Sequence, residues 1–203
     1  MIYLVTDRKI AAKDFYWILK EAVAAGIEGI ILREKDLETE ALLRMAKKVK
    51  AIVAGSRTRL IINGNLAVAK EIGADGYHSG FENFINGDRE NLKNFTGKIG
   101  VSVHSCEEAA EAERRGAHYL LAGHIFETSC KKGLEPRGVA WLREILDTVQ
   151  IPVIAIGGID QRNLNKLQSL GLHGAAVRSL IMKSPEPKNT VRELRHPGLN
   201  FHE

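Results

Sequence analysis

One stretch of the sequence brings a titratable side chain next to basic and hydroxyl-bearing ones. The apolar run Leu120–Ala122 is followed by Gly123 and His124, so a histidine stands where a buried strand would reach the surface. The loop after it carries hydroxyl, thiol and ammonium groups on Thr128, Ser129, Cys130, Lys131 and Lys132. An imidazole beside cationic groups suits acid–base chemistry on an anionic substrate. His124 is therefore the first candidate for a catalytic residue.

Alternating strand and helix patterns supply a frame for this stretch. Short apolar runs predict eight buried strands, at Ile2–Val5, Gly29–Leu32, Leu60–Ile62, Gly76–Ser79, Ile99–Val103, Tyr119–Ala122, Val153–Ile156 and Ala175–Val177. Apolar residues at helical spacing predict helices between them, at Phe15–Ala25, Leu42–Val53, Leu66–Ile72, Val139–Val149 and Leu164–Leu170. A further helix is opened by the capping-box pattern Ser105-Cys106-Glu107-Glu108, and a short last one follows Ser184-Pro185-Glu186-Pro187.

An internal repeat organises these elements. Gly26, Gly73, Gly116 and Gly171 each stand between a helix pattern and a strand pattern, where a glycine can end the helix in the left-handed conformation. Each interval between them holds two strand–helix units, which predicts a compact (β/α)8 TIM barrel as a single domain over residues 1–203. An open doubly wound sheet would leave the repeat unexplained, and the chain lacks the glycine loop of nucleotide-binding sheets.

The charge and the amino-acid composition limit which kinds of ligand or partner we expect. The net charge of +4 is modest and dispersed and aromatic residues make up only 6%, so we expect a small anionic ligand and no nucleic acid. Two isolated cysteines are too few for a disulfide framework or a zinc site, and we expect no metal and no cofactor in a cytoplasmic protein. The chain shows no signal peptide and no apolar run of membrane-spanning length, so no membrane partner is expected. Whether it forms a homo-oligomer is left open.

A parallel barrel places its active site at the carboxyl ends of its strands. The residues that follow the expected strands are mostly cationic or hydrogen-bonding: Thr6, Asp7, Arg33–Lys35, Asn63, His78, Ser79, His104, His124, Gly157, Gly158, Arg178 and Ser179. This set suits a phosphorylated or carboxylated ligand. It lacks the paired carboxylates of a metal centre or a glycosidase.

The individual strand-end residues have competing interpretations. A Gly-Gly pair alone is more often a tight turn, but Gly157-Gly158 after the seventh strand, with Arg178-Ser179 after the eighth, matches the usual phosphate position of barrel enzymes. The Arg33–Lys35 triplet fits a solvated charge run or a ligand contact about equally well. His78 and His104 are read as structural histidines that satisfy backbone groups.

Several segments together resemble the thiamine phosphate synthase superfamily over nearly the whole chain. They are Tyr3-Leu4-Val5-Thr6-Asp7, Leu32-Arg33-Glu34-Lys35, Ile62-Asn63, Gly73-Ala74-Asp75-Gly76, Gly100-Val101-Ser102-Val103-His104 and Ile154-Ala155-Ile156-Gly157-Gly158-Ile159. The segment from Gly123 to Glu135, followed by Arg137-Gly138, is similar to the TenI branch of that superfamily, the thiazole tautomerases.

Departures from the synthase pattern favour the TenI branch. The synthases coordinate magnesium pyrophosphate through two aspartates, whose positions here hold Gly64 and Asn83. The glutamine with which they read the pyrimidine is Ile31, Cys130 replaces their second loop threonine, and His124 replaces a proline. Both metal carboxylates are missing, whereas a histidine that can transfer protons has been gained.

The resemblance therefore implies an isomerase. It would convert the thiazole synthase product, a phosphorylated carboxythiazoline, into the aromatic carboxythiazole phosphate by metal-independent proton transfer in thiamine biosynthesis. His124 would be the general acid/base, Gly157, Gly158 and Ser179 would hold the phosphate, and the further ligand contacts would be Arg33, Asn63, Thr128 and Lys131. The alternatives are a thiamine phosphate synthase and a non-catalytic regulatory or binding protein on the same barrel.

Overall fold

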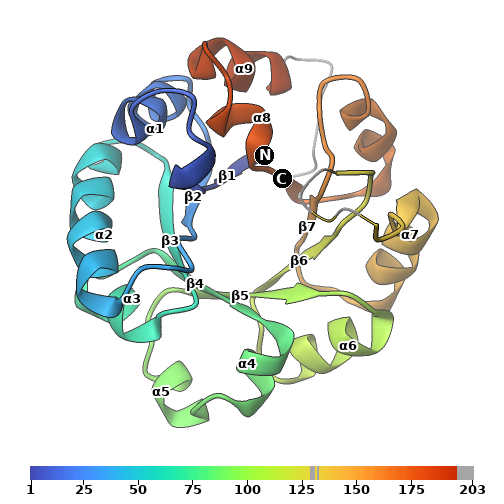
Figure 1. Cartoon of the computed structure of the whole chain (residues 1–203). Coiled ribbons are helices and arrows are strands. Elements are labelled where there is room, and N and C mark those ends of the chain that lie inside the picture. Colours follow the sequence, from blue (N-terminus) through green and yellow to red (C-terminus); the bar gives the residue numbers. More distant parts are fainter. Residues whose placement is uncertain (129–130, 132, 196–203) are drawn as a thin grey trace.

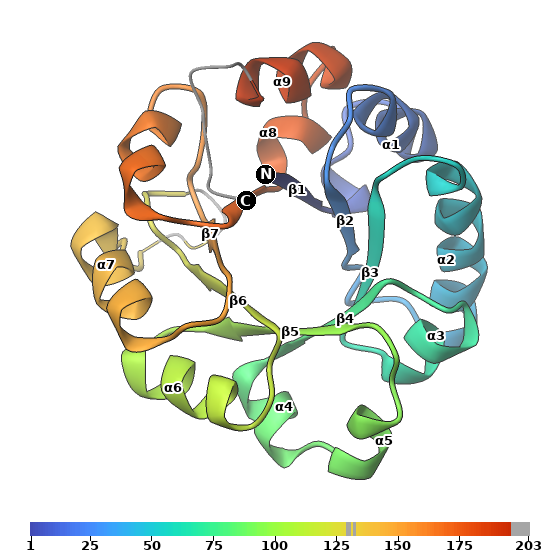
Figure 2. The same ribbon diagram turned by 180° about the vertical axis from the view of Figure 1, so that it is seen from behind.

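Eight parallel strands pair side by side in chain order, and the last pairs with the first to close the sheet. This computed structural model describes residues 1–128, 131 and 133–195, and the predicted (β/α)8 barrel is confirmed. Figure 1 shows the helices as an outer ring around the strands, and Figure 2 shows the same ring from behind.

The elements fall close to the predicted ranges. The strands are β1 (Ile2–Val5), β2 (Gly29–Leu32), β3 (Arg59–Asn63), β4 (Gly76–Gly80), β5 (Lys98–Val103), β6 (Tyr119–Gly123), β7 (Val153–Ile156) and β8 (Gly174–Val177). The helices that had been predicted are α1 (Phe15–Ala24), α2 (Thr39–Val53), α3 (Leu66–Glu71), α6 (Cys106–Arg114), α7 (Gly138–Thr148), η3 (Leu164–Leu170) and α9 (Pro187–Leu194).

The repeated glycine junctions have the conformation that the repeat requires. Gly26, Gly73, Gly116 and Gly171 have φ angles of +80°, +58°, +90° and +72°. This left-handed region costs a glycine little, because it has no Cβ to clash with the backbone. Each junction ends a helix and turns the chain into an even-numbered strand, as predicted.

The structure departs from the predicted elements in a few places. Segment η3 is a 3-10 helix, and the sequence analysis did not predict η1 (Arg8–Ile10), α4 (Phe81–Asn86), α5 (Arg89–Lys93) or α8 (Ser179–Met182). These elements are short, so they carry too few turns to show a helical period. At α6, the Ser105 side chain accepts from the Glu108 N–H, but the Glu108 carboxylate accepts from the His104 N–H, so the capping box is only half formed.

Side chains alternate between the two faces of the closed sheet. Those on the outer face pack under the helices, whereas a separate apolar cluster fills the barrel and includes Tyr3, Ile31, Ile61, Tyr119, Leu121 and Ile154. Glycines on the inner face make room for the two tyrosine rings: a Cβ on Gly100 would overlap the Tyr119 ring, and one on Gly29 would overlap Tyr3. This tight packing closes the barrel below the carboxyl ends of the strands.

We predict that Gly100→Ala destabilises the barrel by about 1–3 kcal/mol, because the added methyl group overpacks against the buried Tyr119 ring. The matched control is Gly80→Ser, since a Cβ at Gly80 meets nothing within 4 Å. Chemical denaturation of the two variants measures the difference. Equal stability of Gly100→Ala and the native protein would contradict the packing described here.

Candidate active site at the carboxyl ends of the strands

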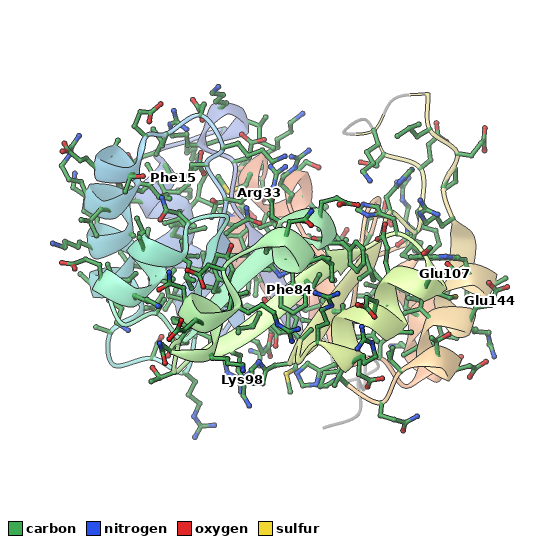
Figure 3. The ribbon with its side chains drawn as sticks, turned by 90° about the horizontal axis from the view of Figure 1, so that it is seen from below. Phe15, Arg33, Phe84, Lys98, Glu107 and Glu144 are labelled. Carbon is green, nitrogen blue, oxygen red and sulfur yellow. The ribbon has the colours of Figure 1, made fainter. Side chains whose placement is uncertain are left out.

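A cavity of about 470 Å³ opens where the strands end. Figure 3 shows Arg33, which follows β2, toward the end of the barrel opposite Lys98, the first residue of β5. The structure brings together in its lining all eight residues predicted for the site, which are Arg33, Asn63, His124, Thr128, Lys131, Gly157, Gly158 and Ser179. Ser129 and Cys130, which the sequence analysis also considered, lie outside the described residues.

The cavity lining is basic. Four basic side chains reach it from three parts of the barrel: Arg33, Lys35, Lys131 and Arg178. The described lining residues include no aspartate or glutamate. A ligand in this cavity therefore meets positive charge and neutral hydrogen-bonding groups, which is the environment of a phosphorylated or carboxylated molecule.

Further lining residues were missed or underrated by the sequence analysis. His104, read as structural, lies in the lining and is half-buried, as is Ser102. Ser102 had a signal, because it shares the inward-facing alternation of β5 with Gly100. Asn83 comes from α4, whose existence the hydrophobic pattern did not show.

His124 is held between two loops. Only 6% of its surface is exposed, and its Nε2 lies 3.3 Å from the carbonyl oxygen of Leu134. A contact with a carbonyl requires a proton on Nε2, which makes this nitrogen the donor. The ring therefore joins β6 to the far end of the loop that carries Lys131.

Gly157 and Gly158 are required by a close approach of two loops. Their φ angles are +106° and +66°. A Cβ on Gly157 would overlap that of His124, and one on Gly158 would lie 2.7 Å from the Phe126 carbonyl oxygen. The tight-turn interpretation is thus correct for the pair.

The same turn is also equipped for an anion. Among the described residues, the backbone N–H groups of Gly157, Gly158 and Ser179 have no hydrogen-bond acceptor in the protein. All three residues line the cavity. Unpartnered amides on adjacent turns form a concave donor surface that suits a phosphate.

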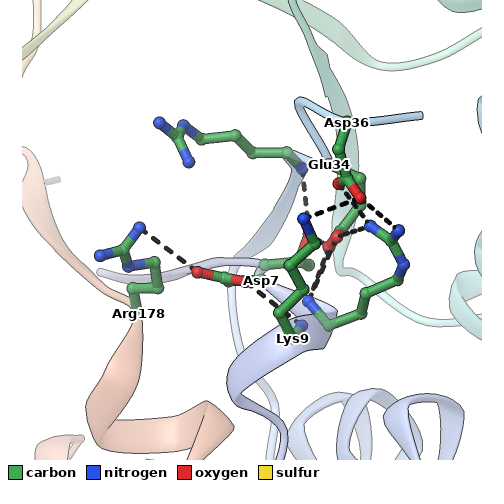
Figure 4. A network of polar contacts seen from close by, with 8 residues as sticks. Asp7, Lys9, Glu34, Asp36 and Arg178 are labelled. Atoms are coloured by element: carbon green, nitrogen blue, oxygen red, sulfur yellow. Dashed lines mark hydrogen bonds and ion pairs between the residues drawn. The ribbon is translucent and has the colours of Figure 1, made fainter. Parts of the chain in front are cut away.

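The Arg33–Lys35 triplet is not a solvated charge run, because its middle residue is buried. Only 6% of Glu34 is exposed, and its carboxylate accepts from the Thr6 hydroxyl at 2.8 Å and from Arg8 Nη1 at 2.9 Å. The Thr6 hydroxyl oxygen in turn accepts from the backbone N–H of Arg33 at 3.0 Å. These bonds tie the end of β1 to the end of β2 and fix the backbone from which the Arg33 side chain starts (Figure 4).

Carboxylates near the cavity are already paired with basic groups of the protein. Arg8 binds Asp36 with two hydrogen bonds of 2.7 Å, and this pairing, with Lys9, holds the pKa of Asp36 well below its usual range. Asp7 lies 3.5 Å from Nη1 of Arg178 (Figure 4). Asp36 offsets Arg8 and Lys9 outside the lining, and Asp7 offsets part of the charge of Arg178, so the lining keeps an excess of basic groups.

His78 lies inside the barrel, below the floor of the cavity. Its Nδ1 is 3.1 Å from the Tyr119 hydroxyl and its Nε2 is 2.8 Å from the Ser102 hydroxyl. The sequence analysis was right to read it as structural, but its partners are side chains and not backbone groups. Burial, with a smaller contribution from Arg33, lowers the pKa of His78 to about 3, so the ring is neutral at physiological pH.

The described residues do not fit a magnesium ion. Magnesium is usually bound through one or two carboxylates together with substrate phosphates. Gly64 and Asn83, where the resemblance to the synthases would place two aspartates, line the cavity, and they offer no side chain and a neutral amide. No group of three or more His, Cys, Asp or Glu residues in the described chain could hold a metal.

Comparison with known proteins identifies the family. The sequence matches the thiamine monophosphate synthase family over residues 2–181. The chain belongs to this family. It is 39% identical to the thiamine-phosphate synthase of Clostridium acetobutylicum over 94% of this chain and 91% of the relative, and 36% identical to that of Pyrococcus abyssi over 96% and 92%. A solved structure of a Pyrococcus furiosus thiamine phosphate pyrophosphorylase has a TM-score of 0.84 at 33% identity, covering 96% of this chain and 93% of that chain.

The comparisons confirm the predicted superfamily but overturn the predicted reaction. The relatives that match nearly the whole chain are named thiamine-phosphate synthases, so the assignment as an isomerase of the thiazole tautomerase type was wrong. That assignment relied on the presence of His124 and the absence of two aspartates. These are only a few positions at one end of the barrel. The similarity to synthases extends through the barrel as a whole.

One further finding concerns membranes. Within the part of the chain that the structure describes, every helix lacks the combination of length and apolar character that spanning a bilayer requires.

We predict that burial of neutral His78 makes the protein less stable in mild acid. The unfolded chain protonates this ring near pH 6.5, whereas the folded chain does so only near pH 3. The unfolded state therefore binds more protons between these values, and the free energy of unfolding should fall as pH is lowered, with His78 contributing up to about 1.4 kcal/mol per pH unit.

Chemical denaturation between pH 4 and pH 7 measures this slope in the native protein and in His78→Gln, which keeps a polar side chain but cannot titrate. The variant should show the shallower pH dependence. Parallel curves for the two proteins would contradict the prediction.

Proposed function

We propose that the protein is a thiamine-phosphate synthase, which joins a pyrimidine pyrophosphate to a thiazole phosphate with release of pyrophosphate. The observation that carries the proposal is 35–39% identity to thiamine-phosphate synthases over nearly the whole of both chains. A basic cavity at the carboxyl ends of the strands supports it, because both substrates are anions and one releases a highly charged leaving group.

The residues divide between two tasks in this proposal. The amides of Gly157, Gly158 and Ser179 would hold a phosphate group at the turns after β7 and β8. Arg33 and Lys131, from opposite sides of the cavity, would bind pyrophosphate and stabilise the charge that develops as it leaves. Asn63 and Thr128 would orient the ligands through neutral hydrogen bonds.

His124 changes role under this proposal. Joining the two substrates forms a carbon–nitrogen bond and breaks the carbon–oxygen bond to pyrophosphate, so no proton has to be moved between carbon atoms. We assign His124 to the departing pyrophosphate, to which a ring protonated on Nδ1 as well would donate a hydrogen bond or a proton from that nitrogen. Its contact with the Leu134 carbonyl also holds the loop that carries Lys131.

The direct test is formation of thiamine phosphate from the two substrates by the purified protein. The product is followed by mass spectrometry, with magnesium in one series and with chelator in the other. Product in either series supports the proposal. Absence of product in both, together with measurable binding of thiazole phosphate, would show a non-catalytic binding protein on the same barrel.

We predict that Lys131→Met lowers kcat/KM by about 10- to 100-fold, because it removes one of the cations that face the leaving group. Lys166→Met is the matched control, since it removes the same charge from an exposed position on η3 outside the cavity lining. Steady-state kinetics of both variants measures the effect. If the two variants lost activity equally, Lys131 would have no special part in the site.

A further inference from the structure

We infer that this cavity binds pyrophosphate through basic side chains and backbone amides, without a divalent cation between ligand and protein. The inference rests on the proposed function for the identity of the ligand. It concerns which groups neutralise the charge of that ligand. The described residues offer basic side chains and backbone amides for this, and no ligands for a bridging metal ion.

The cavity lining is basic. Its described residues combine four basic side chains with no carboxylate, and one of the four, Arg178, lies 3.5 Å from Asp7 outside the lining. Arg33 and Arg178 follow β2 and β8, the two strands that flank β1 in the closed sheet. A fully ionised pyrophosphate carries four negative charges. The protein can therefore offset much of this charge with its own side chains, whereas a magnesium ion placed among them would be repelled.

The next feature is the pair of positions where a metal would be held. A Cβ at Gly64 would meet nothing within 4 Å, although the φ of +80° there strains residues with a side chain, aspartate less than most. Asn83 is an exposed residue of α4 in the cavity lining. Both positions thus have space for a carboxylate, and neither holds one. Gly64 and Asn83 therefore add no negative charge that would repel an anionic ligand.

The acids near the cavity are already engaged within the protein. Glu34 is buried against Thr6 and Arg8, and Asp36 is bound by Arg8 and Lys9. Asp7 is paired with Arg178 at 3.5 Å. Glu108 accepts from the His104 backbone at 2.6 Å. Each of these carboxylates holds the protein's own structure together, and none of them lines the cavity.

The test is calorimetric titration of the full-length protein with inorganic pyrophosphate, first with chelator and then with excess magnesium. We expect binding with chelator, and an affinity that magnesium leaves within about threefold or weakens, because magnesium withdraws charge from pyrophosphate in solution. Affinity at least tenfold tighter with magnesium, or no binding with chelator up to millimolar pyrophosphate, would overturn the inference.

Two substitutions together should make pyrophosphate binding depend on magnesium. Gly64→Asp combined with Asn83→Asp adds two carboxylates to the rim, so pyrophosphate should bind at least about tenfold more weakly with chelator and regain affinity with magnesium. Asn86→Asp is the matched control, since it adds a negative charge to the exposed end of the same helix α4 outside the lining. It should behave as the native protein does. Unchanged chelator affinity in the folded double variant, checked by its melting temperature, would count against the inference.

The inference and the proposed function can fail separately. Thiamine phosphate formed only with magnesium, with tight pyrophosphate binding only in that series, would keep the function and reject the metal-free site. Metal-free pyrophosphate binding without any thiamine phosphate would keep the site and reject the function.

Discussion

Closure of the parallel sheet is the constraint on which the rest of the structure depends. Tyr3 of β1 pairs with Gly29 of β2 on one side and with Ala176 of β8 on the other, so no edge strand is left. Because all strands run in the same direction, every strand-to-helix connection leaves from one end of the barrel. Residues far apart in the sequence, such as Arg33 and Arg178, therefore face one cavity.

The strand ends divide their polar groups between holding the loops and facing the ligand. The carboxylates of Asp7, Glu34 and Asp36 pair with Arg178, Arg8 and Lys9, and they fix the loops after β1 and β2. The lining keeps the basic groups and the unpartnered amides. The ion pairs at the rim thus hold the loops in place, while the excess positive charge remains where an anionic ligand would bind.

The two glycines after β7 show how packing and binding can require the same residue. Gly157 and Gly158 let the turn lie against His124 and Phe126, where any Cβ would overlap. The same absence of side chains exposes their N–H groups to the cavity. A structural role and a ligand-binding role for such a pair are therefore compatible. The sequence had presented them as alternatives.

The sequence by itself determined the eight-fold repeat and the strand positions, because periodic apolar runs and helix-ending glycines are local signals. From the strand positions it followed that the residues after the strands would meet at one end of the barrel. It could not show that Glu34 is buried, that His78 bonds to Tyr119 and Ser102, or that Asn83 reaches the lining from α4. Those facts depend on contacts between segments that only barrel closure brings together. Single positions also could not settle the reaction. His124 and Gly64 suggested an isomerase, but a few residues at one end of a barrel can differ between relatives while the rest of the chain remains similar.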